Sequence, residues 1–115
     1  MRLLEAETRT GRRVRLRVRT RRTGTWQASV SEGAAEPVPP PLATFWVFVD
    51  LSAEPVAFYI ARDEWVRRDI FDAHQAYLAR HGGHRAKNDA SDHHAVRLER
   101  LTGHRDAWDK LGLID

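Results

Sequence analysis

Arginine recurs at every second position along one short stretch of the chain, where it alternates with apolar residues and a threonine. The stretch from Arg12 to Arg22 reads RRVRLRVRTRR. A period of two places successive side chains on opposite faces of a β-strand, so the pattern predicts a strand with one apolar and one cationic face. Guanidinium groups two residues apart on such a strand repel one another unless anions lie across them. The stretch therefore predicts a surface that binds phosphates or other anions.

The positive charge of the chain is local. Residues 1–22 carry nine arginines and two glutamates, a net charge of +7, whereas residues 23–115 carry a net charge of −4. Clustered positive charge is typical of surfaces that bind nucleic acid. The residues that we expect to contact nucleic acid are Arg13, Arg15, Arg17, Arg19, Arg21, Arg22 and the neighbouring aromatic Trp26. The plainer alternative is that the arginines form a solvated face of a sheet.

Length and composition indicate one small domain over residues 1–115. A chain of 115 residues, 42% of them hydrophobic, is sufficient for one modest core. It contains no cysteine, which excludes disulfides and thiolate metal sites. No apolar run approaches the roughly 18 to 20 residues of a membrane span, and no signal-peptide pattern follows the N-terminus. We therefore expect a cytoplasmic protein.

The segments around the arginine strand predict an α/β domain of the α+β type. Residues 3–7 are expected to form a hairpin with the arginine strand through a connection over residues 9–11, with Glu5 opposite Arg15 and Glu7 opposite Arg13. Further strands are expected over 25–30, 44–49 and 56–60, the second of them buried on both faces. The expected architecture is a mixed, mostly antiparallel sheet of about five strands with a helix packed on it.

The expected helix runs from Asp63, as its N-cap, to about His81, because apolar residues there recur with a period of 3.6. A proline-rich surface loop is expected over residues 31–43. Residues 95–101 fit either a short helix or a strand, and residues 106–111 predict a terminal helical turn.

The order of these segments resembles that of small bacterial PD-(D/E)XK nuclease-like domains, which have a restriction-endonuclease-like fold. The resemblance covers roughly residues 2–112 and rests on the strand that ends in VRT, the strands FWVFVDL and PVAFYIA, and a helix that contains His74. In that superfamily an Asp on one strand and a Glu or Gln on the next hold Mg²⁺, and a Lys two residues later positions or activates the attacking water.

This chain departs from the family at those positions. The resemblance places Arg17 at the Glu or Gln position and Arg19 at the Lys position, and the first acidic position falls near Arg2 or before Met1. Mg²⁺ takes oxygen ligands, and Arg stays protonated and cannot act as a base. The resemblance thus implies a catalytically degenerate domain that binds nucleic acid, DNA in the first instance, and needs no cofactor.

Two alternatives stay open. One is an active Mg²⁺-dependent endonuclease, whose metal would be held by acids upstream of Met1 or by Glu5, Glu7 and Asp50. The other is a protein-interaction domain. Family members have a helix and the acidic strand ahead of the hairpin, so the N-terminal helix is expected to be missing here. Its absence would expose a sheet face to a partner or a second copy.

Five histidines cluster in the C-terminal third of the chain: His81, His84, His93, His94 and His104. The pair His81-x-x-His84 offers two nitrogens of the kind that bind Zn²⁺. The spacing matches no known ligand pattern, however, so we predict no metal site.

Overall fold

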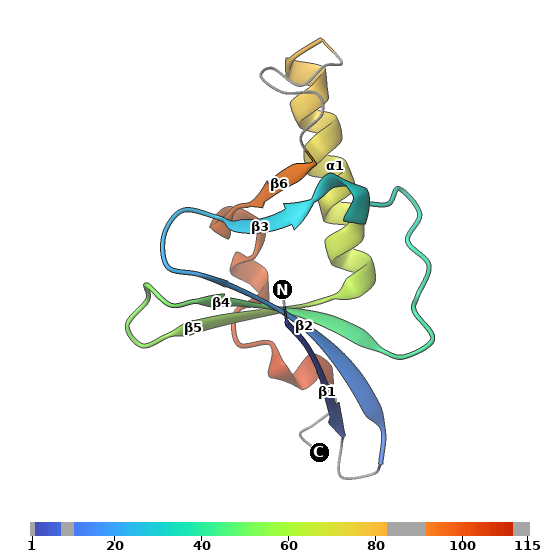
Figure 1. Ribbon diagram of the computed structural model, residues 1–115, viewed down its shortest axis with the longest axis vertical. Coiled ribbons are helices and arrows are strands. Elements are labelled where there is room, and N and C mark those ends of the chain that lie inside the picture. The colour runs from blue at the N-terminus through green and yellow to red at the C-terminus, as the bar shows by residue number, and fades with distance from the viewer. Residues whose placement is uncertain (1, 8–10, 83–91, 112–115) are drawn as a thin grey trace.

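The computed structural model describes residues 2–7, 11–82 and 92–111. Within these ranges the chain forms a central four-stranded sheet, a smaller two-stranded sheet, one α-helix and four short 3-10 turns. Figure 1 shows the helix and the small sheet on one side of the central sheet and the last C-terminal turn on the other side, below it. No helix in the described part of the chain is long and apolar enough to cross a membrane.

The central sheet has the strand order β1-β2-β4-β5. Its strands are β1 (Arg2–Glu7), β2 (Arg13–Arg21), β4 (Thr44–Asp50) and β5 (Ala57–Arg62). β1 pairs with β2 and β4 with β5 in antiparallel fashion, whereas β2 and β4 are parallel. A parallel pair needs a crossover connection. The segment between β2 and β4 therefore passes over one face of the sheet, and it carries the small sheet's first strand.

One face of the central sheet is covered by β3 (Trp26–Ser29), β6 (His93–Val96) and the helix α1 (Asp63–Arg80). The side chains between these layers form the larger part of the core. Its buried members include Trp26, Trp46, Phe48, Tyr59, Val66, Ile70 and Leu101. The opposite face packs on the C-terminal turn η4 (Trp108–Leu111), and there the buried residues include Val14, Phe45, Val47, Ile60 and Leu111.

Several predictions from the sequence are confirmed. Glu5 lies opposite Arg15 and Glu7 opposite Arg13, in the expected register. The strand that begins at Thr44 is buried at every position, and the helix spans nearly the predicted residues. Residues 8–10 of the expected hairpin connection lie outside the described residues. The terminal helical turn forms as η4.

Two predictions need correction, and one open alternative is decided. The expected third strand is β3, which pairs with β6 and leaves the central sheet with four strands, because β4 already occupies the free side of β2. Asp63 is not the N-cap; Arg62 has that position, and Asp63 is the first helical residue and buried. Residues 95–101, for which a short helix and a strand were both open, complete strand β6 (His93–Val96) and then form the 3-10 turn η2 (Leu98–Arg100).

Candidate functional site: a divided arginine strand

The five alternating arginines of β2 share one face of the strand but have two different environments. Arg13 and Arg15 are exposed, with 44% of the Arg15 side chain open to solvent. The side chains of Arg17, Arg19 and Arg21 are only 15%, 13% and 11% exposed. The prediction of one continuous exposed cationic face is therefore wrong for the last three. The layer formed by β3, β6 and α1 covers that end of the strand.

We call the covered residues Arg17, Arg19 and Arg21 the inner arginines. Glu32 is the main anion that faces them. It lies at the end of the 3-10 turn η1 (Val30–Glu32), which follows β3. Its Oε2 accepts hydrogen bonds from Arg17 at 2.7 Å and from Arg19 at 2.9 Å, and its Oε1 accepts one from the Ser29 backbone N–H at 2.8 Å. One carboxylate thus bridges two guanidinium groups whose repulsion would otherwise destabilise the strand.

The position of Glu32 depends on close packing of η1 against α1. Gly33 follows the turn, and a Cβ at this residue would lie 3.0 Å from both the side chain of Ile70 and the backbone nitrogen of Phe71. Any larger residue would push the turn away from the helix. Arg67 of α1 completes the attachment by donating a hydrogen bond to the Glu32 carbonyl oxygen at 3.0 Å.

Asp63 is the second internal anion, and it is only 3% exposed. It accepts a hydrogen bond from Trp46 Nε1 at 2.7 Å and one from Arg67 Nε at 2.9 Å, and it lies 3.9 Å from Arg17 Nη1. Burial lowers the pKa of Arg17, while Glu32 acts in the opposite direction. The Trp46 ring lies under this cluster, since the Arg17 and Arg19 guanidinium carbons are 4.6 and 4.8 Å from its centroid.

Arg21 has a carboxylate of its own. It lies 2.8 Å from Asp50, the strand neighbour on β4, and Asp50 also accepts a hydrogen bond from the Ser52 hydroxyl at 2.6 Å. The hydrogen bond from Arg21, with those from Ser52, lowers the pKa of Asp50 from 3.8 to about 2. Asp50 is therefore committed to a structural ion pair.

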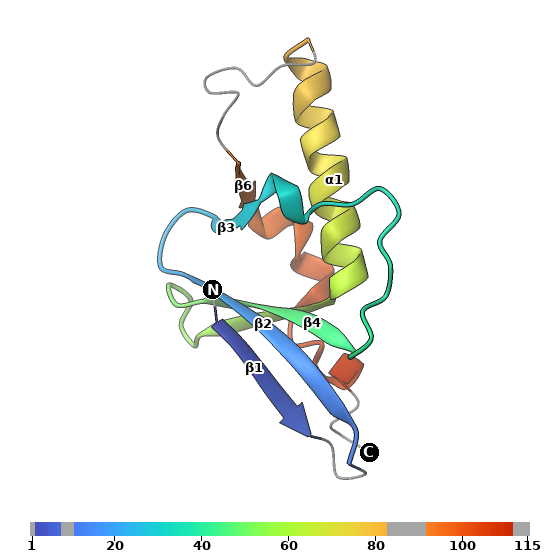
Figure 2. The ribbon, with the colours of Figure 1, turned by 45° about the vertical axis from the view of Figure 1, so that its right-hand side comes forward.

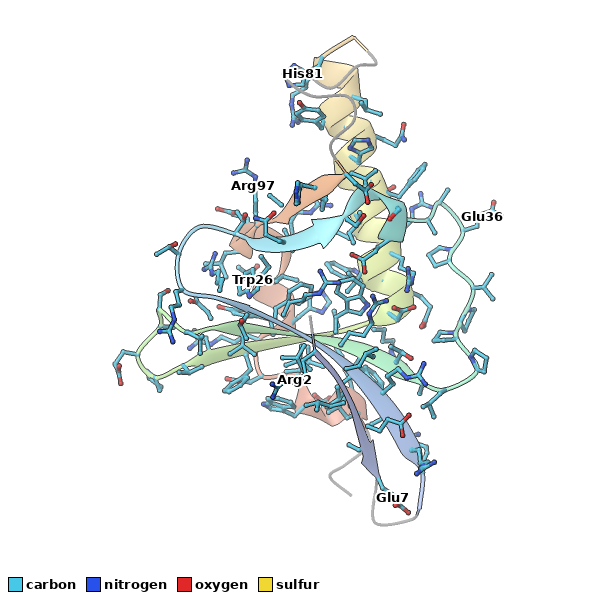
Figure 3. The ribbon with its side chains drawn as sticks, viewed as in Figure 1. Arg2, Glu7, Trp26, Glu36, His81 and Arg97 are labelled. Atoms are coloured by element: carbon cyan, nitrogen blue, oxygen red, sulfur yellow. The ribbon has the colours of Figure 1, made fainter. Side chains whose placement is uncertain are left out.

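Trp26 lies beneath Arg21 and has no exposed surface. The Arg21 guanidinium carbon is 4.0 Å from the ring centroid, and the indole N–H donates to the Val49 carbonyl at 3.0 Å. Figure 3 shows Trp26 between the two sheets. A stacking base needs an open ring face, so buried Trp26 offers no surface for the nucleic-acid contact that the sequence predicts.

The three acids predicted as metal ligands do not converge. Glu5 lies opposite Arg15 on one side of β2, and Asp50 lies opposite Arg21 on the other. Six positions along a strand correspond to about 20 Å, whereas the ligands of one Mg²⁺ all lie about 2.1 Å from the ion. Within the described ranges no group of three or more His, Asp or Glu side chains could hold a metal ion. His84 lies outside those ranges.

Sequence reasoning missed the internal roles of Glu32, Asp63 and Arg67. Asp63 and Arg67 had a local signal, because they stand four residues apart on a predicted helix and directly follow a buried strand. Glu32 had only the S-x-x-E spacing of a capping box with Ser29, which accounts for its contact with the Ser29 backbone N–H but not for its contacts with the arginines. The net negative charge of residues 23–115 was the more general signal, because a covered cationic row needs anions from elsewhere in the chain.

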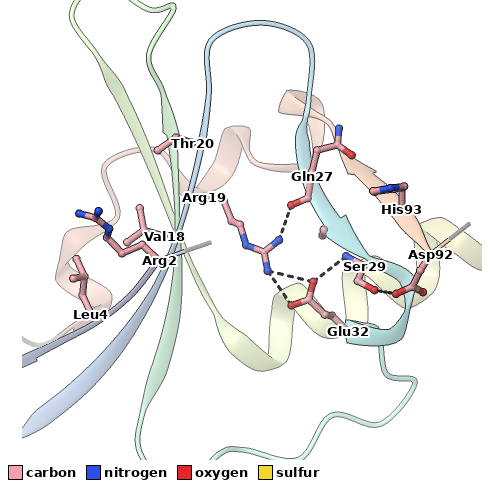
Figure 4. Close-up of a pocket in the computed structure, with 11 residues that line it drawn as sticks. Arg2, Leu4, Val18, Arg19, Thr20, Gln27, Ser29, Glu32, Asp92 and His93 are labelled. Carbon is pink, nitrogen blue, oxygen red and sulfur yellow. Dashed lines mark hydrogen bonds and ion pairs between the residues drawn. The ribbon is translucent and has the colours of Figure 1, made fainter.

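A groove of about 1010 Å³ opens beside the inner arginines, between β1 and β2 on one side and the small sheet on the other (Figure 4). Arg2, Leu4 and Val18 line its first wall. Arg19 of β2 also lines the groove, and the facing side is polar, with Gln27, Ser29, Glu32, Asp92 and His93. Arg2 is paired with Val18 on β2, so it lies on the opposite face of the sheet from Arg17 and Arg19.

No family model, no curated protein and no solved structure matches the chain, so the function has to be inferred from these contacts.

Proposed function

We propose that the domain is a non-catalytic nucleic-acid-binding module, a degenerate relative of the PD-(D/E)XK nucleases, which contacts phosphates through Arg13 and Arg15. The observation that supports this proposal is the exposure of these two arginines on one face of the hairpin. They stand roughly 6.6 Å apart, two strand positions. Among the described residues, the ion-pair partner of Arg15 is Glu5, at the loose distance of 3.6 Å, and both side chains of that pair are about half exposed.

The inner arginines serve a different purpose in this proposal. Arg17, Arg19 and Arg21 are bound to the carboxylates of Glu32 and Asp50. A phosphate could take these arginines only by leaving a covered carboxylate without its partner, which typically costs several kcal/mol. Phosphate binding is therefore assigned to the outer half of the strand alone.

The absence of catalysis in this proposal rests on the same cluster. Arg17 and Arg19 occupy the positions that the resemblance gives to a metal ligand and a lysine, and both guanidinium groups donate to Glu32. Asp63, the other nearby carboxylate, is occupied by Trp46 and Arg67. A supercoiled plasmid should stay intact with Mg²⁺ or Mn²⁺. Nicking that requires the metal and disappears in Glu5→Ala or Asp50→Ala would favour the enzyme instead.

The binding site is tested with a labelled duplex of mixed sequence, measured by fluorescence anisotropy. We expect Arg13→Gln with Arg15→Gln to weaken binding about tenfold or more at low salt, because two phosphate contacts are lost. Arg80→Gln with Arg97→Gln is the control, since it removes the same charge from exposed positions elsewhere. Equal losses in both double variants would contradict the assignment, and an RNA duplex in parallel shows which nucleic acid is preferred.

The salt dependence of wild-type binding distinguishes contacts by Arg13 and Arg15 alone from contacts that also include Arg17 and Arg19. The logarithm of the association constant is plotted against the logarithm of the salt concentration. Two duplex phosphate contacts predict a slope of about −2 in this plot, whereas four arginines along the phosphates predict about −4. A slope near −4 would mean that inner arginines leave their carboxylates on binding. Affinity without any salt dependence would remove the proposal.

A further inference from the structure

The C-terminal segment crosses the edge of the central sheet that β5 forms. Its turn η3 (Thr102–His104) lies on the side of the sheet that carries α1, and η4 lies on the other side, where Leu111 is fully buried (Figure 2). Between the two turns, the Asp106 backbone N–H donates to the Phe58 carbonyl of β5 at 2.9 Å. The contacts of this short segment with β5 therefore help to hold η4 on the sheet.

A lysine and a histidine meet at this edge. Lys110 Nζ lies 2.7 Å from His104 Nδ1 and donates a hydrogen bond to the Ile60 carbonyl of β5 at 3.1 Å. An ammonium group has N–H donors and no acceptor, so the imidazole nitrogen has to accept. His104 is therefore neutral in this contact, with its proton on Nε2. The pair links η4 to both η3 and β5.

The surroundings of His104 oppose its protonation. Burial and the charge of Lys110 lower the pKa of His104, while the Ile60 carbonyl and Asp69 of α1 act in the opposite direction. The Asp69 carboxylate is already paired with Arg100 of η2. A positive charge on the imidazole ring would thus share Asp69 with Arg100 and lie directly beside the ammonium group.

The other neighbours of the pair complete this environment. The Trp65 ring of α1 packs on the imidazole, with the ring centroids 4.2 Å apart. Burial lowers the pKa of Lys110, Asp109 acts in the opposite direction, and Arg62 of β5 lowers it further. Lys110 is thus held between one carboxylate and one guanidinium group, which leaves a second cation at His104 poorly balanced.

We propose that His104 is a pH-sensitive switch for η4, which holds the turn on the sheet while neutral and releases it when protonated. Protonation turns the ring nitrogen from an acceptor into a donor and places a second cation 2.7 Å from the ammonium group. The protonated ring also competes with Lys110 for the Ile60 carbonyl. In the open form, η4 leaves the sheet and uncovers apolar residues such as Phe45 and Val47.

The direction of the pH effect follows from the two forms. A histidine in water has a pKa of about 6.5, and burial in the closed form lowers the pKa of His104. The contact therefore stabilises the closed form fully above about pH 6.5 and is lost as the pH falls through the lower value. One proton taken up on opening shifts the equilibrium at most about tenfold per pH unit, so the open form gains up to about tenfold at pH 5.5. The switch is independent of the proposed function, because it involves neither Arg13 nor Arg15.

Opening of η4 is measured by amide hydrogen exchange of residues 105–111, with rates corrected for the intrinsic effect of pH. Their protection should fall about three- to tenfold from pH 7.5 to 5.5. At pH 5.5 it should also be at least about tenfold lower than that of β4, since the turn opens while the sheet stays folded. Unchanged protection would mean that Lys110 swings away alone, and equal protection of β4 would mean that η4 opens only with the whole fold. Either result would overturn the proposal.

A substitution of His104 separates its titration from that of other groups. His104→Gln keeps an acceptor for Lys110 but has no proton to gain, so the change in protection between the two pH values should shrink to less than about twofold. His74→Gln is the matched control, because His74 packs beside Tyr77 on α1 and should leave the pH dependence as in the wild type. Wild-type pH dependence in His104→Gln would overturn the proposal, as would its loss in His74→Gln.

The tautomer of His104 is tested in the wild type, where no substitution can disturb the fold. Nitrogen NMR of the imidazole ring at pH 7.5 should show a proton on Nε2 and none on Nδ1, because Nδ1 accepts from Lys110. On titration to pH 5.5 the ring should gain its second proton together with the loss of protection at residues 105–111. A ring that carries its proton on Nδ1 at pH 7.5, or that becomes charged while η4 stays protected, would overturn the proposal.

Discussion

The two halves of β2 have the same residue pattern and different surroundings. Arg13 and Arg15 lie on the part of the hairpin that extends away from the second layer, where their neighbours on β1 are exposed glutamates. Arg17, Arg19 and Arg21 continue the same row under that layer and meet carboxylates and indole rings. A period of two therefore defines a face of a strand, but the layer that packs on the face decides whether its charges are free for a ligand.

The two halves should also differ in energy. Exposed ion pairs such as Arg15 with Glu5 usually contribute less than about 1 kcal/mol. Removing one partner of a covered pair costs more, about 3–5 kcal/mol in buried cases, because the remaining charge has lost both water and its counter-ion. This difference can be measured within one molecule.

The largest effect is expected for Asp63→Ala. This change removes the carboxylate that accepts hydrogen bonds from the Trp46 indole N–H and from Arg67 Nε in a covered site. We expect a loss of about 3–5 kcal/mol in the free energy of unfolding, measured by urea denaturation. Asp72→Ala is the matched control, because Asp72 forms an exposed pair with Arg68 on the same helix, and it should cost less than about 1 kcal/mol. Equal losses in Asp63→Ala and Asp72→Ala would contradict the distinction between covered and exposed ion pairs.

The next effect is the coupling between Arg17 and Glu32. Each single change to Met should destabilise the protein, but the double variant should cost less than the sum of both, with a coupling energy of about 1–3 kcal/mol. The pair of Arg15 and Glu5 gives the comparison cycle, whose coupling should stay below about 0.5 kcal/mol. Similar coupling energies in the two cycles would show that coverage by the second layer has no energetic consequence.

The smallest effect concerns acid stability and Asp50. Its pKa is lowered to about 2 in the folded protein, so the unfolded chain takes up the proton first as the pH falls. The stability contributed by the pair with Arg21 is therefore present above about pH 4 and is lost as the pH falls toward 2. We expect a contribution on the order of 1–2 kcal/mol.

The measurement for Asp50 compares the unfolding free energies of wild type and Asp50→Asn between pH 5 and 2. The difference between the two proteins should shrink across that range, because the asparagine has no proton to gain. A constant difference would mean that the pair with Arg21 does not lower the pKa.

The sequence predicted local features of the fold well. The hairpin register followed from the alternation of charges on residues 3–7 and 12–22, and the buried strand and the helix followed from their apolar periodicity. These features depend on residues close together in the chain. The separate pairing of β3 with β6 depends on segments more than sixty residues apart, for which a single sequence carries no pairing signal.

The candidate site was predicted only in part for the same reason. The choice of β2 as the strand that carries the cationic row was sound, and Arg13 and Arg15 are exposed as expected. The covering of Arg17 and Arg19 depends on Glu32, a residue brought to them by the chain's turn at η1 and its packing on α1. Nothing in the local sequence of the proline-rich segment indicates that contact.

The division of the arginine strand is tested most directly by five single variants, each of which replaces one arginine of β2 with glutamine. We predict a step in the free energy of unfolding along the strand. Arg13→Gln and Arg15→Gln should stay within about 0.5 kcal/mol of wild type, whereas changes at Arg17, Arg19 and Arg21 should each cost about 2 kcal/mol or more. A uniform small effect at all five positions would contradict the division and return the row to a single solvated face.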